Sequence, residues 1–186
     1  MTLVESLEIP DLFYSFGITH PGAITLYNYP SFLQQLVRDN GEFFDLAAVG
    51  ILRDRERGVP RYNDFRELIG RERVKSFEEI TDNKKWVKEL REVYQNNIDS
   101  MDLMVGMFAE NPPEGFGFSD TAFRVFILMA SRRLKSDRFF TEDYRAEIYT
   151  QFGLDWIDDN NMLTVLRRHY PSLNPALFSV ENAFAP

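Results

Sequence analysis

Helical spacing of apolar residues runs through most of this 186-residue chain, and alternating strand patterns are scarce. Residues 83–94 are the clearest case, because Trp86, Val87, Leu90 and Tyr94 share one helical face. Further helices are expected over residues 31–38, 43–57, 62–69, 142–149 and 160–169. The pattern predicts a mainly α architecture without an internal repeat or a clear interdomain linker.

A longer helix is expected after Ser119, whose hydroxyl is suited to capping it. Residues 122–130 are apolar almost all round this helix. We therefore expect it to be central and surrounded by other helices.

The end of this long helix carries Arg132 and Arg133, which follow its apolar stripes. A guanidinium carried toward an apolar interior needs a partner. That partner is either an internal carboxylate, such as Asp137 or Asp45, or an acidic ligand. The sequence alone leaves both alternatives open, and we favour the internal salt bridge.

Composition excludes several kinds of chemistry. The chain has no cysteine, and therefore no disulfide, thiolate metal ligand or cysteine nucleophile. Its formal net charge is −8 and its basic residues are scattered, which argues against a nucleic-acid surface.

The most apolar stretch, 122–130, is too short to span a bilayer. We expect a soluble chain, or one that rests on a membrane through some other part.

Histidine spacing argues against a self-contained metal site. His20 and His169 are the two histidines, so neither a helical zinc pair nor a di-iron motif exists, and no metal ligand is assigned. His20 lies in a turn sequence, where it is either bonded to nearby backbone or contacts a cofactor or substrate. His169 ends a helix and suits the negative end of its dipole.

The stretch DLAAVGILRDRERGVPRYNDFR, residues 45–66, resembles the signature of the cyclooxygenase-peroxidase superfamily of haem enzymes, the animal haem peroxidases. Its Arg53–Arg57 and Val59–Asn63 segments look most like fatty-acid α-dioxygenases. Other stretches resemble that family in the same order along almost the whole chain: 11–17, 20–22, 28–30, 103–106, 130–134, 137–141, 153–156 and 168–171.

The resemblance implies the C-terminal helical portion of the haem peroxidase fold. Enzymes of this family use haem and a tyrosyl radical to remove a hydrogen from the α-carbon of a fatty acid, and then add O₂ to give a 2-hydroperoxy acid. Residues 1–186 are expected to be a single unit, the C-terminal part of such a catalytic domain.

This sequence also departs from the family pattern. The distal histidine, proximal histidine and radical tyrosine of the family lie upstream of the matched region, so we assign no catalytic residue here. We expect no haem on this chain alone and inactivity without an N-terminal haem-binding portion or a partner chain. Gly50 stands where related peroxidases place an asparagine that bonds the proximal histidine.

Family roles carry over to four arginines. Arg133, with Arg132 beside it, matches the arginine expected to anchor the fatty-acid carboxylate, since a guanidinium can fork to a carboxylate. Arg53 and Arg55 match arginines near the haem, as propionate-side or supporting residues.

Two other functions are compatible with the sequence. The chain could be a degenerate helical interaction module that kept the fold and lost the haem, or a peroxidase or diol-synthase relative with another substrate. A cytoplasmic or peripheral-membrane location is expected, with any membrane contact made through the missing part.

Overall fold

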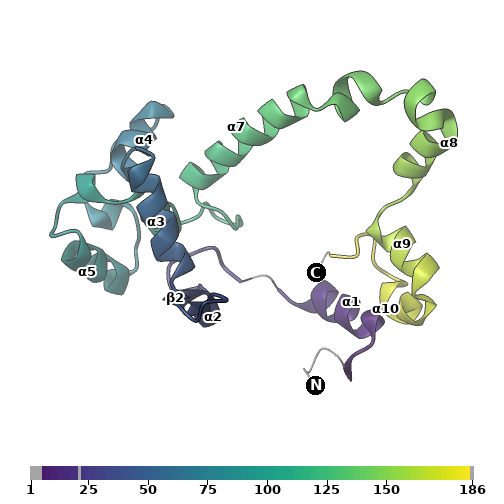
Figure 1. Cartoon of the computed structure of the whole chain (residues 1–186), viewed down its shortest axis with the longest axis horizontal. Coiled ribbons are helices and arrows are strands. Elements are labelled where there is room, and N and C mark those ends of the chain that lie inside the picture. Colours follow the sequence, from purple (N-terminus) through teal and green to yellow (C-terminus); the bar gives the residue numbers. More distant parts are fainter. Residues whose placement is uncertain (1–5, 21, 185–186) are drawn as a thin grey trace. The chain divides into compact units, whose positions relative to one another are not determined.

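A computed structural model describes residues 6–20 and 22–184 of the chain. Its contacts divide the chain into two compact units. We call Gly22–Ser131 the central unit, and Met1–Pro21 together with Arg132–Pro186 the terminal unit. Both units are helical, which confirms the mainly α prediction (Figure 1).

The central unit opens with a short hairpin that the sequence pattern did not predict. Helix α2 (Ser31–Gln34) is followed by strand β1 (Leu36–Val37), which pairs antiparallel with β2 (Phe43–Phe44). Gly41 turns the chain at φ 81°, a conformation that favours glycine. The helix expected over 31–38 is therefore wrong beyond Gln34, because the chain reverses at this turn.

Helix α3 (Leu46–Glu56) begins later than the expected residue 43, because Phe43 and Phe44 belong to β2. Asp45 caps α3 by accepting hydrogen bonds from the backbone N–H groups of Ala47 and Ala48, at 2.9 and 3.1 Å. The cap fixes where α3 starts.

The core of the central unit lies between α4 (Tyr62–Leu68), α5 (Lys84–Val93) and α6 (Leu103–Ala109). Short 3₁₀ turns η2 (Phe77–Glu79) and η3 (Ile98–Ser100) complete it. The core side chains are Tyr62, Val74, Phe77, Ile80, Val87, Leu90, Tyr94, Met101, Leu103 and Ala109. The predicted apolar face of α5 is confirmed at three of its four positions, since Val87, Leu90 and Tyr94 are buried and Trp86 is half-buried.

Tyr62 and Gly106 pack α4 directly against α6. A Cβ atom at Gly106 would lie 2.2 Å from Cδ2 of the fully buried Tyr62 ring. Only a residue without a side chain allows this approach.

Helix α7 (Asp120–Ser136) is the predicted long helix, but the expected burial of its apolar residues is wrong for most of 126–129 and neighbouring positions, whose side chains are exposed or only half-buried. Phe126, for example, is 62% exposed, and Ile127, Leu128 and Met129 are also exposed. The aromatic contacts of α7 are local, because Phe123 meets Phe126 and the preceding loop residue Phe116.

The terminal unit contains α1 (Ile9–Ile18), the π-helical turn η4 (Phe139–Asp143), α8 (Ala146–Asp159), α9 (Met162–His169), the 3₁₀ turn η5 (Pro171–Leu173) and α10 (Asn174–Leu177). Leu154, Leu163, Leu166 and Leu173 are its buried hydrophobic residues. The helix expected over 142–149 is replaced by η4 and the start of α8. Thr150, at φ 62° and ψ 154°, kinks α8.

Candidate functional site

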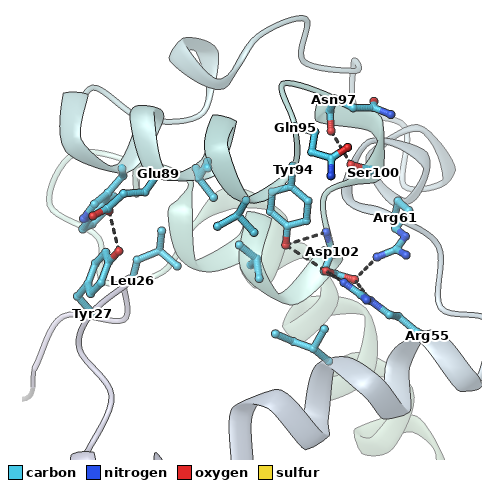
Figure 2. A pocket seen from close by; sticks show the side chains of 15 residues that line it. Leu26, Tyr27, Arg55, Arg61, Glu89, Tyr94, Gln95, Asn97, Ser100 and Asp102 are labelled. Carbon is cyan, nitrogen blue, oxygen red and sulfur yellow. Dashed lines mark hydrogen bonds and ion pairs between the residues drawn. The ribbon is translucent and has the colours of Figure 1, made fainter.

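An open cavity of about 880 Å³ lies within the central unit (Figure 2). Residues of α3, α5 and α6 line it, together with chain between these helices. Its apolar lining residues include Leu26, Ile51, Trp86, Leu90, Val93 and Val105.

Asp102 collects most of the polar contacts in this cavity. Its Oδ1 accepts a hydrogen bond from Arg55 Nε at 2.8 Å, and its Oδ2 accepts one from Arg55 Nη2 at 2.6 Å. Arg61 Nη1 also donates to Oδ1, and the Tyr94 hydroxyl donates to Oδ2 at 3.0 Å. Figure 2 shows these side chains converging on the carboxylate. We call them the Asp102 cluster: Arg55, Arg61, Tyr94 and Asp102.

The Asp102 cluster ties four helices together. Arg55 lies in the last turn of α3, Arg61 precedes α4, Tyr94 ends α5 and Asp102 precedes α6. The Asp102 side chain is only 8% exposed, so its charge depends on these partners.

Burial alone would raise the pKa of Asp102. The hydrogen bonds from Arg55 and Tyr94 and the charge of Arg61 outweigh burial, so the pKa of this carboxyl lies below its usual range. Burial raises the pKa of Tyr94 to about 12, and the neighbouring Asp102 charge acts in the same direction. Asp102 is therefore an anion at neutral pH, and Tyr94 is a neutral donor.

A second buried cluster joins α4, α6 and the start of α7. The Tyr62 hydroxyl donates to Glu110 Oε2 at 2.9 Å, and Arg66 Nη1 lies 3.6 Å from Glu110 Oε1. Arg66 Nη1 also donates to Thr121 Oγ1 at 3.0 Å. Burial, followed by the Glu110 charge, raises the pKa of Tyr62 well above its usual value. These contacts fasten the first turn of α7 to the core.

Arg132 and Arg133 lie near the C-terminal end of α7, and both are exposed. Among the described residues of the terminal unit, neither forms an ion pair with a carboxylate. Asp137 accepts from the Phe139 N–H at 2.9 Å and Asp45 caps α3. The internal salt bridge favoured from the sequence is therefore wrong for Asp137, which forms no ion pair with either arginine among the described residues. The Asp45 carboxylate accepts hydrogen bonds from the first turn of α3 and so serves as its N-cap.

The terminal unit has its own cavity of about 560 Å³, between α1, α9 and the C-terminal segment. Its lining is mostly apolar, and His20 is one of its members. His169, the other histidine, is exposed at the end of α9.

The sequence pattern did not single out Asp102, Arg61 or Glu110, and it named Tyr94 only as part of a buried helix face. One signal was available for Asp102, which is a lone carboxylate between Met101 and Leu103, both buried. A charge flanked by buried apolar residues requires a partner. The identity of that partner is set by tertiary structure, since Arg55 lies 47 residues away.

No set of three or more His, Cys, Asp or Glu side chains among residues 6–20 and 22–184 could hold a metal ion. In the same residues, none of the helices combines the length and apolar character needed to cross a bilayer.

Comparison with known proteins gives the class to which this helical chain belongs. The model of the animal haem peroxidase family matches residues 2–181. The chain therefore belongs to the animal haem peroxidase family, as the sequence motifs implied.

Within this family, the chain is similar to plant α-dioxygenases. It is 42% identical to alpha-dioxygenase 2 of Arabidopsis thaliana over 97% of its own length and 30% of that protein. The crystal structure of the fatty acid alpha-dioxygenase of Arabidopsis thaliana matches 95% of the chain with a TM-score of 0.85 and 40% identity, covering 29% of that protein.

A crystal structure of a substituted Oryza sativa fatty acid alpha-dioxygenase with palmitic acid gives a TM-score of 0.84 at 40% identity, over 94% of this chain and 30% of that one. The chain thus spans about 30% of the length of the relatives that it matches.

The described residues around the central cavity do not fit a haem. Neither histidine lines it, so it has no imidazole to ligate iron. The Nε and Nη2 groups of Arg55, which could bind a haem propionate, already donate hydrogen bonds to Asp102. Arg53 is exposed on α3 and is not a lining residue. The assignment of Arg53 and Arg55 to the haem periphery stays a prediction.

Proposed function

We propose that this chain is the C-terminal part of a haem-dependent fatty-acid α-dioxygenase. The reaction replaces one α-hydrogen of a fatty acid by a hydroperoxy group, and both oxygen atoms of O₂ enter the 2-hydroperoxy acid. The proposal is supported by the 42% identity to a plant α-dioxygenase along almost the whole chain. The single unit predicted over residues 1–186 would then be one part of a larger catalytic domain.

Arg133, with Arg132 beside it, is the proposed anchor for the fatty-acid carboxylate. The observation that carries this role is an exposed guanidinium pair without a carboxylate partner in its unit, one turn beyond exposed Met129 and Leu128 on α7. A guanidinium beside apolar side chains suits a ligand with a carboxylate head and a hydrocarbon tail.

Haem would supply the oxidising chemistry of the complete enzyme, held by residues other than those of the central cavity. The residues of this chain would contribute binding and orientation. The carboxylate fixed on Arg133 places the adjacent α-carbon at a constant distance from α7, since only one bond separates the two carbons.

A chimera tests this function directly. This chain replaces the matching segment of the rice fatty-acid α-dioxygenase, and O₂ uptake with palmitic acid is measured along with the hydroperoxy product. We expect a haem-loaded, active enzyme. A chimera that folds without binding haem would favour the haem-free interaction module.

Arg133→Gln in this chimera is expected to raise the KM for palmitic acid by about tenfold or more, because a charge-assisted hydrogen bond is lost. Lys135→Gln is the matched control, since it removes one positive charge from the same exposed end of α7. An unchanged KM in Arg133→Gln would contradict the anchor and favour a relative with another substrate.

A haem titration of this chain alone is the simplest further check. We expect no shift of the Soret band, because the resemblance places the haem-ligating histidines of the family upstream of the region matched by this chain. A shift would show that His20 or His169 ligates iron, and would contradict the proposed division of roles.

A further inference from the structure

Asn40 is the only asparagine in the chain that a glycine follows. It lies in the turn between β1 and β2, where residues 38–42 are all exposed. Two backbone hydrogen bonds shape this turn: Arg38 N–H donates to the Glu42 carbonyl at 2.9 Å, and Gly41 N–H donates to the Arg38 carbonyl at 2.8 Å. Asn40 therefore meets solvent on a turn that opens when few bonds break.

The Asn40 side chain folds back over the peptide bond that follows it. Its Oδ1 accepts the Glu42 N–H at 3.1 Å, which closes an Asx turn. Its Nδ2 donates to Glu42 Oε2 at 3.0 Å. The ring closed by the first of these bonds contains both Asn40 Cγ and the Gly41 nitrogen, so the fold keeps these two atoms near each other.

Gly41 leaves its own backbone nitrogen uncovered. Its φ is 81°, and a Cβ atom built there would meet nothing within 4 Å. Because glycine has no side chain, no atom of residue 41 shields this nitrogen from the Asn40 side chain. A residue with a side chain would shield it, and a β-branched residue such as Ile98, which follows Asn97, would shield it most.

We propose that Asn40 is a site of spontaneous deamidation. The Gly41 nitrogen forms a bond to Asn40 Cγ once its hydrogen bond to Arg38 opens. Its proton passes to the side-chain nitrogen, and the bond from Cγ to Nδ2 breaks with release of ammonia.

The product of this step is a five-membered imide, which water then opens. Breaking one of its two C–N bonds gives aspartate, and breaking the other gives isoaspartate. The net change takes up one water and releases one ammonia, without oxidation or reduction. The modification does not rest on the proposed function.

Deamidation would loosen the β1–β2 hairpin. The amide that donates to Glu42 would become a carboxylate, so that two negative charges face each other across the same short distance. Isoaspartate also adds one carbon to the backbone, which alters the spacing of the turn. The hydrogen bond from Arg38 N–H to the Glu42 carbonyl should then open more often.

Peptide mapping of the aged chain tests the site. The whole folded chain is kept for several days in mildly alkaline buffer and is then digested with trypsin under mildly acidic conditions. Cleavage after Arg38 and Arg53 releases residues 39–53, in which Asn40 is the only asparagine. We expect mass spectrometry to show progressive conversion of this peptide, and an isoaspartate methyltransferase to label it.

The peptide of residues 146–167 is the internal reference. It contains Asn160 and Asn161, each followed by a residue with a side chain. We expect its conversion to be slower by about tenfold or more, because a side chain on the following residue hinders the attack. Conversion of both peptides at the same rate, or no conversion of 39–53, would overturn the proposal.

Asn40→Gln tests the ring-closing step. Glutamine keeps the side-chain amide, but its additional methylene requires a six-membered ring, which forms more slowly. We expect peptide 39–53 of this variant to stay unconverted over the same period. Conversion as fast as in the parent chain would show direct hydrolysis of the amide, and would overturn the role of Gly41.

Asn40→Asp reproduces the aspartate product and tests the effect on the hairpin. We expect the Arg38 amide hydrogen to exchange with solvent about threefold or more faster in this variant than in the fresh parent chain, because its bond to Glu42 is weakened. The aged parent chain should show the same increase in its converted fraction. Equal exchange rates in the fresh chain, the aged chain and the variant would overturn the proposed loosening.

Discussion

Arg55 and Arg61 converge on one buried carboxylate in the central unit, whereas Arg132 and Arg133 lie exposed without a carboxylate partner in the terminal unit. The first pair is part of the folded framework, because it joins helices through Asp102. The second pair joins no helices through an ion pair among the described residues of its unit. Substitutions in the two pairs should therefore differ in their effect on stability, because only the first pair compensates a buried charge.

Gly106→Ala should give the largest loss of stability in the central unit. The added Cβ would lie 2.2 Å from the Tyr62 ring, and the fully buried ring has little room to move. We expect the free energy of unfolding to fall by about 3 kcal/mol or more, measured by urea denaturation. Gly117→Ala is the control, because a Cβ there meets nothing within 4 Å. Equal losses in the two variants would show that the close packing of α4 on α6 is unimportant.

Asp102→Asn should give the second-largest loss of stability. The variant leaves Arg55 and Arg61 facing each other without their anion, and their partial exposure moderates the cost. We expect a loss of about 2–3 kcal/mol in the free energy of unfolding. Asp39→Asn, at an exposed position of the hairpin turn, should change it little. Equal stability of Asp102→Asn and Asp39→Asn would show that the pairing of Arg55 and Arg61 with Asp102 does not stabilise the central unit.

Alkaline pH should weaken the Asp102 cluster through Tyr94. The folded pKa of Tyr94, about 12, lies above the ordinary value of 10.0, so its contribution is complete below pH 10 and disappears as the pH rises toward 12. Urea denaturation over this interval should show a falling free energy of unfolding. Tyr94→Phe should make the decrease of the unfolding free energy with pH shallower. If the pH dependence is unchanged in this variant, it is caused by other groups, of which Tyr62 is the first candidate.

The double variant Arg132→Gln with Arg133→Gln should have the smallest effect on stability. Neither side chain has an ion-pair partner among the described residues of its unit, so we expect a change within about 0.5 kcal/mol. Urea denaturation of the double variant and the parent chain gives this difference. A loss comparable to that of Asp102→Asn would mean that these arginines also belong to the framework.

The sequence pattern was a good guide where a helix has a distinct apolar face and a clear cap. For α5, the spacing of Val87, Leu90 and Tyr94 predicted both the helix and its buried side. The hairpin was missed because Phe43 and Phe44 also fit a helical pattern. Their strand conformation depends on pairing with Leu36 and Val37 and on the Gly41 turn.

The candidate site was less accessible to sequence reasoning than the fold. Family motifs pointed to Arg55, but its partner Asp102 is distant in the chain, and only the folded structure brings them together. The apolar character of 122–130 correctly predicted a helix but not its burial. Periodicity records which side chains are apolar, and cannot record whether another part of the same chain covers them.

The exposed side chains of Phe126, Ile127, Leu128 and Met129 on α7 have a consequence for the colloidal behaviour of this protein in solution. The net charge of −8 keeps copies apart at low ionic strength. Added salt screens this repulsion over distances of about 10 Å at 0.1 M. The concentration at which the chain stays monodisperse should therefore fall as salt is added, so that purification favours dilute buffers of low ionic strength.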